Sequence, residues 1–151
     1  MNDPHMPPHP MKLMGRAMRG FSRLADAALR DLGFATGQLP VLVSLKHRQT
    51  LSQAELARIA QVEQPSMAQL LNRMERDGLV QRMADPADKR SRLVSLTADA
   101  GERMPQARAV MQSLSQQALA GFTPEELAQL TELMARLNQN IDRMADAADS
   151  L

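Results

Sequence analysis

The strongest constraint on the fold is a heptad pattern in the last third of the chain. Apolar residues recur there in steps of three and four, at Leu127, Leu130, Met134, Leu137, Ile141, Met144 and Ala148. This spacing predicts one long helix with a narrow apolar stripe, which we call the heptad seam. Because polar residues flank the seam, we expect its first six residues to form a dimer interface, as in a coiled coil. The alternative is a core helix within a monomer.

Capping residues and apolar periodicity predict five further helices. Their expected ranges are Met11–Leu32, Thr36–His47, Gln53–Ala60, Pro65–Asp77 and Ala98–Ala120. In the first, one apolar stripe runs through Leu13, Ala17, Phe21, Leu24, Ala28 and Leu32. Gly33 is the expected C-cap of that helix, and Thr36 is the expected N-cap of the next. Ser52 and Glu55 form a capping box, as do Thr123 and Glu126 before the seam.

The periodicity changes to two after Gly78. Leu79–Met83 and Arg92–Leu96 are short β-compatible segments, and the polar residues between them include a proline. The middle of the chain therefore predicts two helices and a turn followed by a β-hairpin, which is a helix-turn-helix with a wing. The expected fold class is mainly α, with a small β-hairpin wing and a helical dimerisation region.

The predicted helix Pro65–Asp77 has a polar outward face that suits the major groove of DNA, which admits one α-helix. Gln and Asn side chains bond adenine edges, and Arg bonds guanine edges or phosphates. A solvated polar face, common to surface helices, is the alternative. The expected DNA contacts of this helix are Gln64, Pro65, Ser66, Gln69, Asn72, Arg73 and Arg76.

The loop of the hairpin concentrates basic residues. Lys89, Arg90 and Arg92 lie within four residues of one another, and Asp88 stands beside them. Arginine at a wing tip suits the negative potential of the minor groove, and Asp88 suits a role in holding Arg90 or the loop backbone in shape. A hairpin whose charges serve solubility alone is the alternative.

Composition excludes several classes of function. The 151 residues include no cysteine, so disulfides, thiol nucleophiles and Cys-ligated zinc are excluded. The only histidines are His5, His9 and His47, and no Gly-rich phosphate loop or catalytic triad stands out, so we expect neither an enzyme nor a metal site. Aromatic residues make up 2%, which disfavours single-stranded nucleic acids as ligands. No export or membrane-spanning segment is visible, so we expect a cytoplasmic protein without a membrane partner.

The chain resembles the MarR family of bacterial transcription regulators. The resemblance rests on Leu51–Ala57, Leu70–Val80, Asp85–Arg90 and Leu93–Thr97, and the order of elements matches from about Met11 to Ala147. It implies a homodimer on an inverted-repeat operator of double-stranded DNA, with half-sites about 10 bp apart. The corresponding division is a Pro-rich arm at 1–10, a dimerisation region at 11–35 and 98–151, and a DNA-binding lobe at 36–97.

Many members of this family are repressors that release DNA when a small, often aromatic, acid binds between lobe and dimerisation region. Arg16 and Arg19 offer anchors for a carboxylate, and Met14, Met18, Phe21 and His47 lie on the expected pocket side. Each also has an ordinary structural explanation as a surface, core or helix-end residue. We therefore expect a repressor released by a small aromatic acid, with no cofactor. The alternative is a winged-helix adaptor that binds proteins without specific DNA binding.

Overall fold

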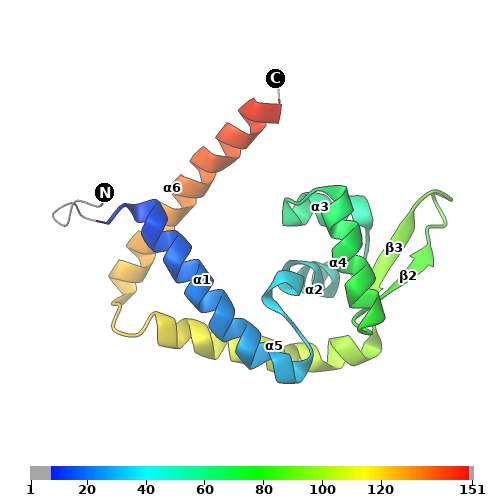
Figure 1. Ribbon diagram of the computed structural model, residues 1–151, viewed down its shortest axis with the longest axis horizontal. Helices are drawn as coiled ribbons and strands as arrows, with labels where there is room; N and C mark the ends of the chain where they lie inside the picture. Colours follow the sequence, from blue (N-terminus) through cyan, green and yellow to red (C-terminus); the bar gives the residue numbers. More distant parts are fainter. Residues whose placement is uncertain (1–7, 150–151) are drawn as a thin grey trace. The chain divides into compact units, whose positions relative to one another are not determined.

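The computed structural model describes residues 8–149, which form a chain of helices with one small sheet (Figure 1). The elements, in chain order, are α1 (Pro10–Leu29), η1 (Arg30–Leu32), η2 (Thr36–Gln38), α2 (Leu39–Arg48), β1 (Thr50–Ser52), α3 (Gln53–Ala60), α4 (Gln64–Arg76), β2 (Val80–Ala84), β3 (Arg92–Leu96), α5 (Ala98–Ala118) and α6 (Pro124–Asp149). The chain divides into two compact units between Ser115 and Gln116. Within residues 8–149 no helix is long and apolar enough to cross a membrane. Most of the predicted Pro-rich arm lies outside the described residues.

The first unit is built around one hydrophobic core. Leu42, Leu56 and Leu71 bring α2, α3 and α4 together there, each about 1% exposed or less. Val80 and Val94 close the core from the sheet, and Leu29 and Ala107 join it from α1 and α5. The helix-turn-helix, the wing and the flanking helices therefore share a single core.

The buried face of α1 differs from the predicted one. Ala25 and Leu29 are fully buried, whereas Leu13 and Leu24 of the predicted stripe are 47% and 62% exposed. The periodicity located an apolar face of the helix correctly, but that face is not the one packed within this chain.

The start of α2 also differs from the prediction. Thr36 is the first residue of the short helix η2, not the N-cap of α2, which begins at Leu39. The backbone N and Oγ1 of Thr36 both donate to Oδ1 of Asp26, at 2.7 and 2.8 Å. These two hydrogen bonds hold the pKa of Asp26 below its usual value. Thr36 thus ties the loop after α1 back to α1.

The helix-turn-helix follows the local signals closely. Ser52 Oγ accepts from the Glu55 N–H at 3.2 Å, and the Glu55 carboxylate accepts from the Ser52 N–H at 2.8 Å. This capping box begins α3 where predicted and lowers the pKa of Glu55. Helix α4 starts one residue earlier than predicted, at Gln64, and Gly78 ends it with a φ of 73°.

The sheet has three antiparallel strands in the order β1–β3–β2, so the predicted hairpin is joined by a strand that the sequence did not predict. In β1, Leu51 pairs with Val94 and is buried. In the hairpin, Val80 pairs with Leu96 and Ala84 with Arg92, one residue beyond the predicted end of β2. In Figure 1 the β2–β3 hairpin projects beyond the helices of the lobe.

The second unit contains the end of α5 and all of α6. Helix α5 ends at Ala118, two residues before the predicted end, and Gly121 follows with a φ of 86°. The capping box of Thr123 and Glu126 forms as predicted and begins α6. The heptad seam lies along this helix and is largely uncovered, since Ile141 is 43% and Met144 71% exposed.

Candidate nucleic-acid interface

Helix α4 presents one fully buried and one fully exposed face. Met67, Leu71 and Met74 are 0% exposed and fix the helix on the core. The seven residues predicted to contact DNA all lie on the exposed side: Gln64, Pro65, Ser66, Gln69, Asn72, Arg73 and Arg76. Neither Arg73 nor Arg76 has an ion-pair partner within residues 8–149. The face therefore offers amide, hydroxyl and guanidinium groups that no residue between 8 and 149 covers.

The wing loop is shaped by its two aspartates. Asp85 Oδ1 accepts from the Ala87 N–H at 2.8 Å, and Asp88 Oδ1 accepts from the Arg90 N–H at 2.9 Å. Asp88 thus holds the loop backbone rather than the guanidinium of Arg90. Lys89 and Arg90 are exposed at the tip of the loop, and neither forms an ion pair with a described residue. The carboxylates stabilise the turn and leave the cations available to a polyanion.

Arg92, the remaining wing residue of the prediction, opens β3 and is exposed. The basic residue that the sequence analysis overlooked is Arg82, on the neighbouring strand opposite Val94. Its side chain is only 16% exposed, and its Nε lies 3.7 Å from a carboxylate oxygen of Glu75 in the last turn of α4. Alternate residues of a strand point to the same face, so Arg82 shares the face of the apolar Val80. This alternation would have placed Arg82 on the inner face of the hairpin. Arg82 therefore links the wing to the exposed helix.

Two cavities lie beside the lobe, both within the first unit. The larger, about 740 Å³, is lined by α2 and α5, and three basic side chains line it: Lys46, His47 and Arg108. Its other walls are apolar: Leu39, Leu42, Val43, Met104, Pro105, Ala107 and Met111. Neither Lys46 nor Arg108 has an ion-pair partner in the described part of the chain. This cavity combines an apolar body with uncompensated positive charge.

The second cavity, about 650 Å³, lies between α1, α2 and the end of α3. Met18 and Phe21 of the predicted effector residues line it, together with Ile59. His47 lines the larger cavity instead. The remaining three predicted effector residues, Met14, Arg16 and Arg19, line neither cavity. Lys46 and Arg108 were missed because only the fold brings α2 and α5 together.

No group of three or more His, Asp or Glu side chains that could hold a metal ion occurs in residues 8–149. The buried side chains of this part of the chain are all apolar. The polar groups that stand out are those of the α4 face, the wing and the cation-lined cavity.

The chain is similar to known proteins both in sequence and in fold. Residues 36–91 match the model of the MarR family. A mutant of MarR from E. coli, crystallised with operator DNA, is 26% identical; the alignment covers 84% of this chain and 91% of that one, with a TM-score of 0.78. A probable transcriptional regulator from Pseudomonas aeruginosa is 27% identical over 85% of this chain and 96% of that one, with a TM-score of 0.78.

A third structure has the same fold at lower identity. It is that of BpsR from Bordetella bronchiseptica, whose DNA binding is described as regulated by 6-hydroxynicotinic acid. The identity is 21%, the coverage 85% of this chain and 97% of that one, and the TM-score 0.74. The family match covers the helix-turn-helix together with the first strand and the loop of the wing, and the whole chain has the winged-helix fold of these MarR-like regulators.

Proposed function

We propose that the protein is a homodimeric, sequence-specific DNA-binding transcription regulator, a repressor that a small acid releases from its operator. The observation that carries the proposal is the uncovered polar face of α4 beside the cationic wing tip. The relative from E. coli that was crystallised with operator DNA supports it.

The exposed face of α4 suits a major groove. The helix has 13 residues, about 20 Å at 1.5 Å per residue, and the groove is about 12 Å wide. Gln64, Ser66 and Gln69 lie in its first two turns, where side chains of a recognition helix meet base edges. Arg73 and Arg76 lie further along, where contacts to phosphates are more common. The wing tip with Lys89 and Arg90 then serves the adjacent minor groove.

Two uncovered apolar faces support a homodimer, one in each unit. In α1, Leu13 is 47% and Leu24 62% exposed, and their spacing of eleven residues places them on the same side of the helix. In α6, Leu133 is 50% and Met144 71% exposed. Contiguous apolar residues at helical spacing, left uncovered along two helices, are typical of an interface with another chain. A second copy brings the same two faces, and its two-fold symmetry matches an inverted repeat in DNA.

The larger cavity supports the effector. Its volume of about 740 Å³ falls in the usual range of small-molecule sites, about 300–1,000 Å³. Lys46 and Arg108 offer positive charges to a carboxylate, and His47 offers a further hydrogen-bonding group. Val43, Met104 and Met111 offer contacts to the apolar part of a ligand. Thioether and aliphatic walls accept a flat ring as readily as a short chain. We therefore propose a small acid, with aromatic acids as the first class to test.

The test of DNA binding is selection from random duplexes by the purified protein, followed by sequencing of the retained DNA. The expected result is an inverted repeat whose half-sites lie about one helical turn, roughly 10 bp, apart. Gln69→Ala should lose discrimination at one base pair of each half-site, by about 1–3 kcal/mol. An exposed glutamine of α6 outside the seam, changed as Gln139→Ala, is the control. Recovery of no motif would contradict the proposal and favour a protein-binding adaptor.

The test of the dimer is a charge placed in the heptad seam. Leu137→Asp should dissociate the dimer, because an unpaired carboxylate would be buried between the subunits. Ala135→Asp places the same charge on an exposed position of α6 outside the seam and should leave the dimer intact. Sedimentation velocity at several protein concentrations distinguishes the two results. A dimer that survives Leu137→Asp would place the interface elsewhere.

The test of repression and release uses transcription in vitro from a promoter that contains the selected repeat. The protein should reduce transcription, and benzoate or hydroxybenzoates should restore it in a concentration-dependent way. Arg108→Ala should raise the acid concentration that is needed, whereas Gln106→Ala, an exposed neighbour outside the cavity, should not. A response that is unchanged in Arg108→Ala would exclude this cavity as the effector site.

A further inference from the structure

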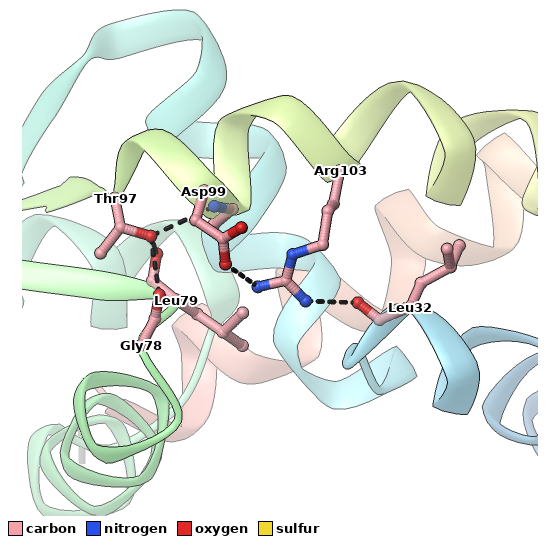
Figure 2. A network of polar contacts seen from close by, with 7 residues as sticks. Leu32, Gly78, Leu79, Thr97, Asp99 and Arg103 are labelled. Atoms are coloured by element: carbon pink, nitrogen blue, oxygen red, sulfur yellow. Dashed lines mark hydrogen bonds and ion pairs between the residues drawn. The ribbon is translucent and has the colours of Figure 1, made fainter.

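Arg103, on α5, is bonded at once to two separate parts of the first unit (Figure 2). Its Nη1 donates to the carbonyl oxygen of Leu32 at 2.6 Å, and its Nη2 donates to Oδ2 of Asp99 at 2.7 Å. The guanidinium carbon also lies 5.1 Å from the centre of the Phe34 ring, which is 4% exposed. One planar group is therefore fixed from three sides.

The contact to Leu32 satisfies the end of the first helical segment. Leu32 is the last residue of η1, where carbonyl groups have no partner within the helix and carry partial negative charge. Gly33 follows with a φ of 76°, and a Cβ there would lie 2.6 Å from Nη1 of Arg103. The glycine thus leaves the space through which the guanidinium reaches the carbonyl. A lysine has no fork that could bond both Leu32 and Asp99 with the same rigid geometry.

The contact to Asp99 connects Arg103 with the residues that follow α4, because Asp99 is two residues from Thr97, which bonds Gly78. Asp99 lies in the first turn of α5, directly after the N-terminal hydrogen bonds of Thr97. Thr97 Oγ1 accepts from the Ala100 N–H at 3.2 Å and donates to the carbonyl oxygen of Gly78 at 2.7 Å, and the Thr97 N–H donates to that of Leu79 at 3.1 Å. Figure 2 shows the bonds of the Thr97 hydroxyl and those of Arg103 near the start of α5.

These bonds form one connection between the end of η1, which directly follows α1, and Gly78, two residues after the end of α4. From the carbonyl of Leu32 the connection passes through Arg103 and Asp99 into the first turn of α5, and from there through Thr97 to Gly78. Helix α1 carries an uncovered apolar face, and α4 carries the exposed polar face. In a two-fold dimer that closes on α1, the distance between the two copies of α4 depends on the placement of α4 relative to α1 within each protomer.

We infer that Arg103 is a positioning residue for DNA recognition: by holding α1 against the start of α5, it sets the half-site spacing that the dimer accepts. The inference rests on the proposed function. It assigns to Arg103 no contact with DNA, since its side chain is occupied by Leu32, Asp99 and Phe34. It predicts an effect on spacing that is separate from the effect on affinity for a single half-site.

The experiment compares Arg103→Met, Arg103→Lys and Asp99→Asn with wild type. Glu102→Gln, an exposed neighbour on α5, is the control. The duplexes carry the selected repeat with its own spacing, with one or two base pairs added or removed, or with one half-site only. One base pair rotates a half-site by about 34°, because B-DNA has about 10.5 bp per turn. We expect wild type and Glu102→Gln to lose affinity about tenfold for each such change, the cost of twisting the DNA or the dimer.

In Arg103→Met the same change should cost about threefold or less, while affinity for the single half-site stays within about twofold of wild type. In Arg103→Lys and Asp99→Asn, the loss of affinity for each change of spacing should lie between that of Arg103→Met and that of wild type. A variant that is only less folded would lose affinity for all duplexes by one factor and keep the spacing ratio of wild type. That result would overturn the inference. If Arg103→Met does not fold, as judged by far-UV circular dichroism, Asp99→Asn decides, since it keeps the guanidinium and its bond to Leu32.

The proposed function and the inference fail in distinguishable ways. Wild-type protein without any preference for an inverted repeat would overturn both. Wild-type protein with a sharp spacing preference that Arg103→Met and Asp99→Asn share would overturn the inference alone.

Discussion

Replacing Gly33 by alanine perturbs the structure at the point where the end of η1 meets Arg103. Gly33 has a φ of 76°, a conformation that L side chains rarely adopt, and an added Cβ would lie 2.6 Å from Nη1 of Arg103. Gly78, with a φ of 73°, and Gly121, with a φ of 86°, have no heavy atom within 4 Å of an added Cβ. Alanine at any of the three positions therefore strains the backbone. Only at position 33 does its Cβ also collide with a side chain.

The expected loss of stability follows from these two contributions. An L residue in the left-handed region costs about 1–2 kcal/mol, so Gly78→Ala and Gly121→Ala should each cost about that much. In Gly33→Ala the guanidinium must also move and lose its bond to Leu32. A hydrogen bond of a charged group contributes about 1.5–3 kcal/mol, and we reduce this to about 1–2 because the Arg103 side chain is 29% exposed. Gly33→Ala should therefore cost about 2–4 kcal/mol.

The assay is urea unfolding followed by far-UV circular dichroism, because the chain has neither Trp nor Tyr for fluorescence. All variants are compared at one protomer concentration, since the stability of a dimer depends on it. The double variant Gly33→Ala/Arg103→Met isolates the contact. Without the guanidinium, Gly33→Ala should cost only the backbone contribution. The free energy of coupling between the two substitutions should therefore be about 1–2 kcal/mol. The reasoning would be refuted by a Gly33→Ala that costs no more than Gly78→Ala, or that costs as much in the Arg103→Met background as in wild type.

Three further changes test the wing, the loop after α1 and the exposed face of α1. Arg90→Ala should weaken operator binding by about 1–3 kcal/mol at matched salt, most where A·T pairs flank the half-sites; unchanged affinity would remove the wing from the interface. Hydrogen bonds from Thr36 lower the pKa of Asp26, so their stabilisation is present above the ordinary value of 3.8 and disappears as the pH falls through the lowered pKa. Thr36→Val should therefore lower the urea midpoint at neutral pH and less in strong acid, while an equal loss at both would contradict this origin. Leu24→Asp should dissociate the dimer and leave the protomer helical, whereas Ala25→Asp, one residue on, should unfold it, as sedimentation and circular dichroism would show.

The parts of the fold that the sequence predicted well depend on neighbours along the chain. The capping boxes at Ser52 and Thr123 each join residues three apart, and both helices begin where the boxes predict. Gly33 and Gly78 end helical segments in the left-handed region, as their position after an apolar pattern indicated. In all these cases the partner atoms lie within one turn of helix, so the sequence alone contains the whole interaction.

The parts that the sequence did not predict depend on partners far along the chain. Strand β1 has three residues and exists through its pairing with β3. Thr36 has the residue type of an N-cap, but its hydroxyl is engaged by Asp26, ten positions earlier. Arg103 has an ordinary position on a helix, and only the fold brings it to Leu32, 71 positions earlier. A pattern search confined to windows of one helix has no access to such contacts.

The candidate site likewise has one part that the sequence predicted and one part that it did not. The exposed polar residues of α4 were predicted because one helix alone separates its apolar and polar faces, with Met67 and Met74 on one side and Gln69 on the other. The cation-lined cavity was not, because it needs Lys46 and Arg108 from helices that are distant in sequence. A surface formed by one element can be derived from its periodicity, whereas a cavity between elements requires their packing.

Helix α1 shows what periodicity leaves undecided even within one element. Successive residues of a helix point about 100° apart, so Leu24 and Ala25 face different directions, and the first is 62% exposed while the second is fully buried. The chain packs the helix through the small Ala25 and through Leu29, and leaves its larger apolar side chains uncovered. An apolar pattern indicates that a face is to be buried, but not which chain covers it. A helix that uses one face for its own core and keeps a second apolar face exposed is suited to joining two protomers, which is the role proposed here for α1.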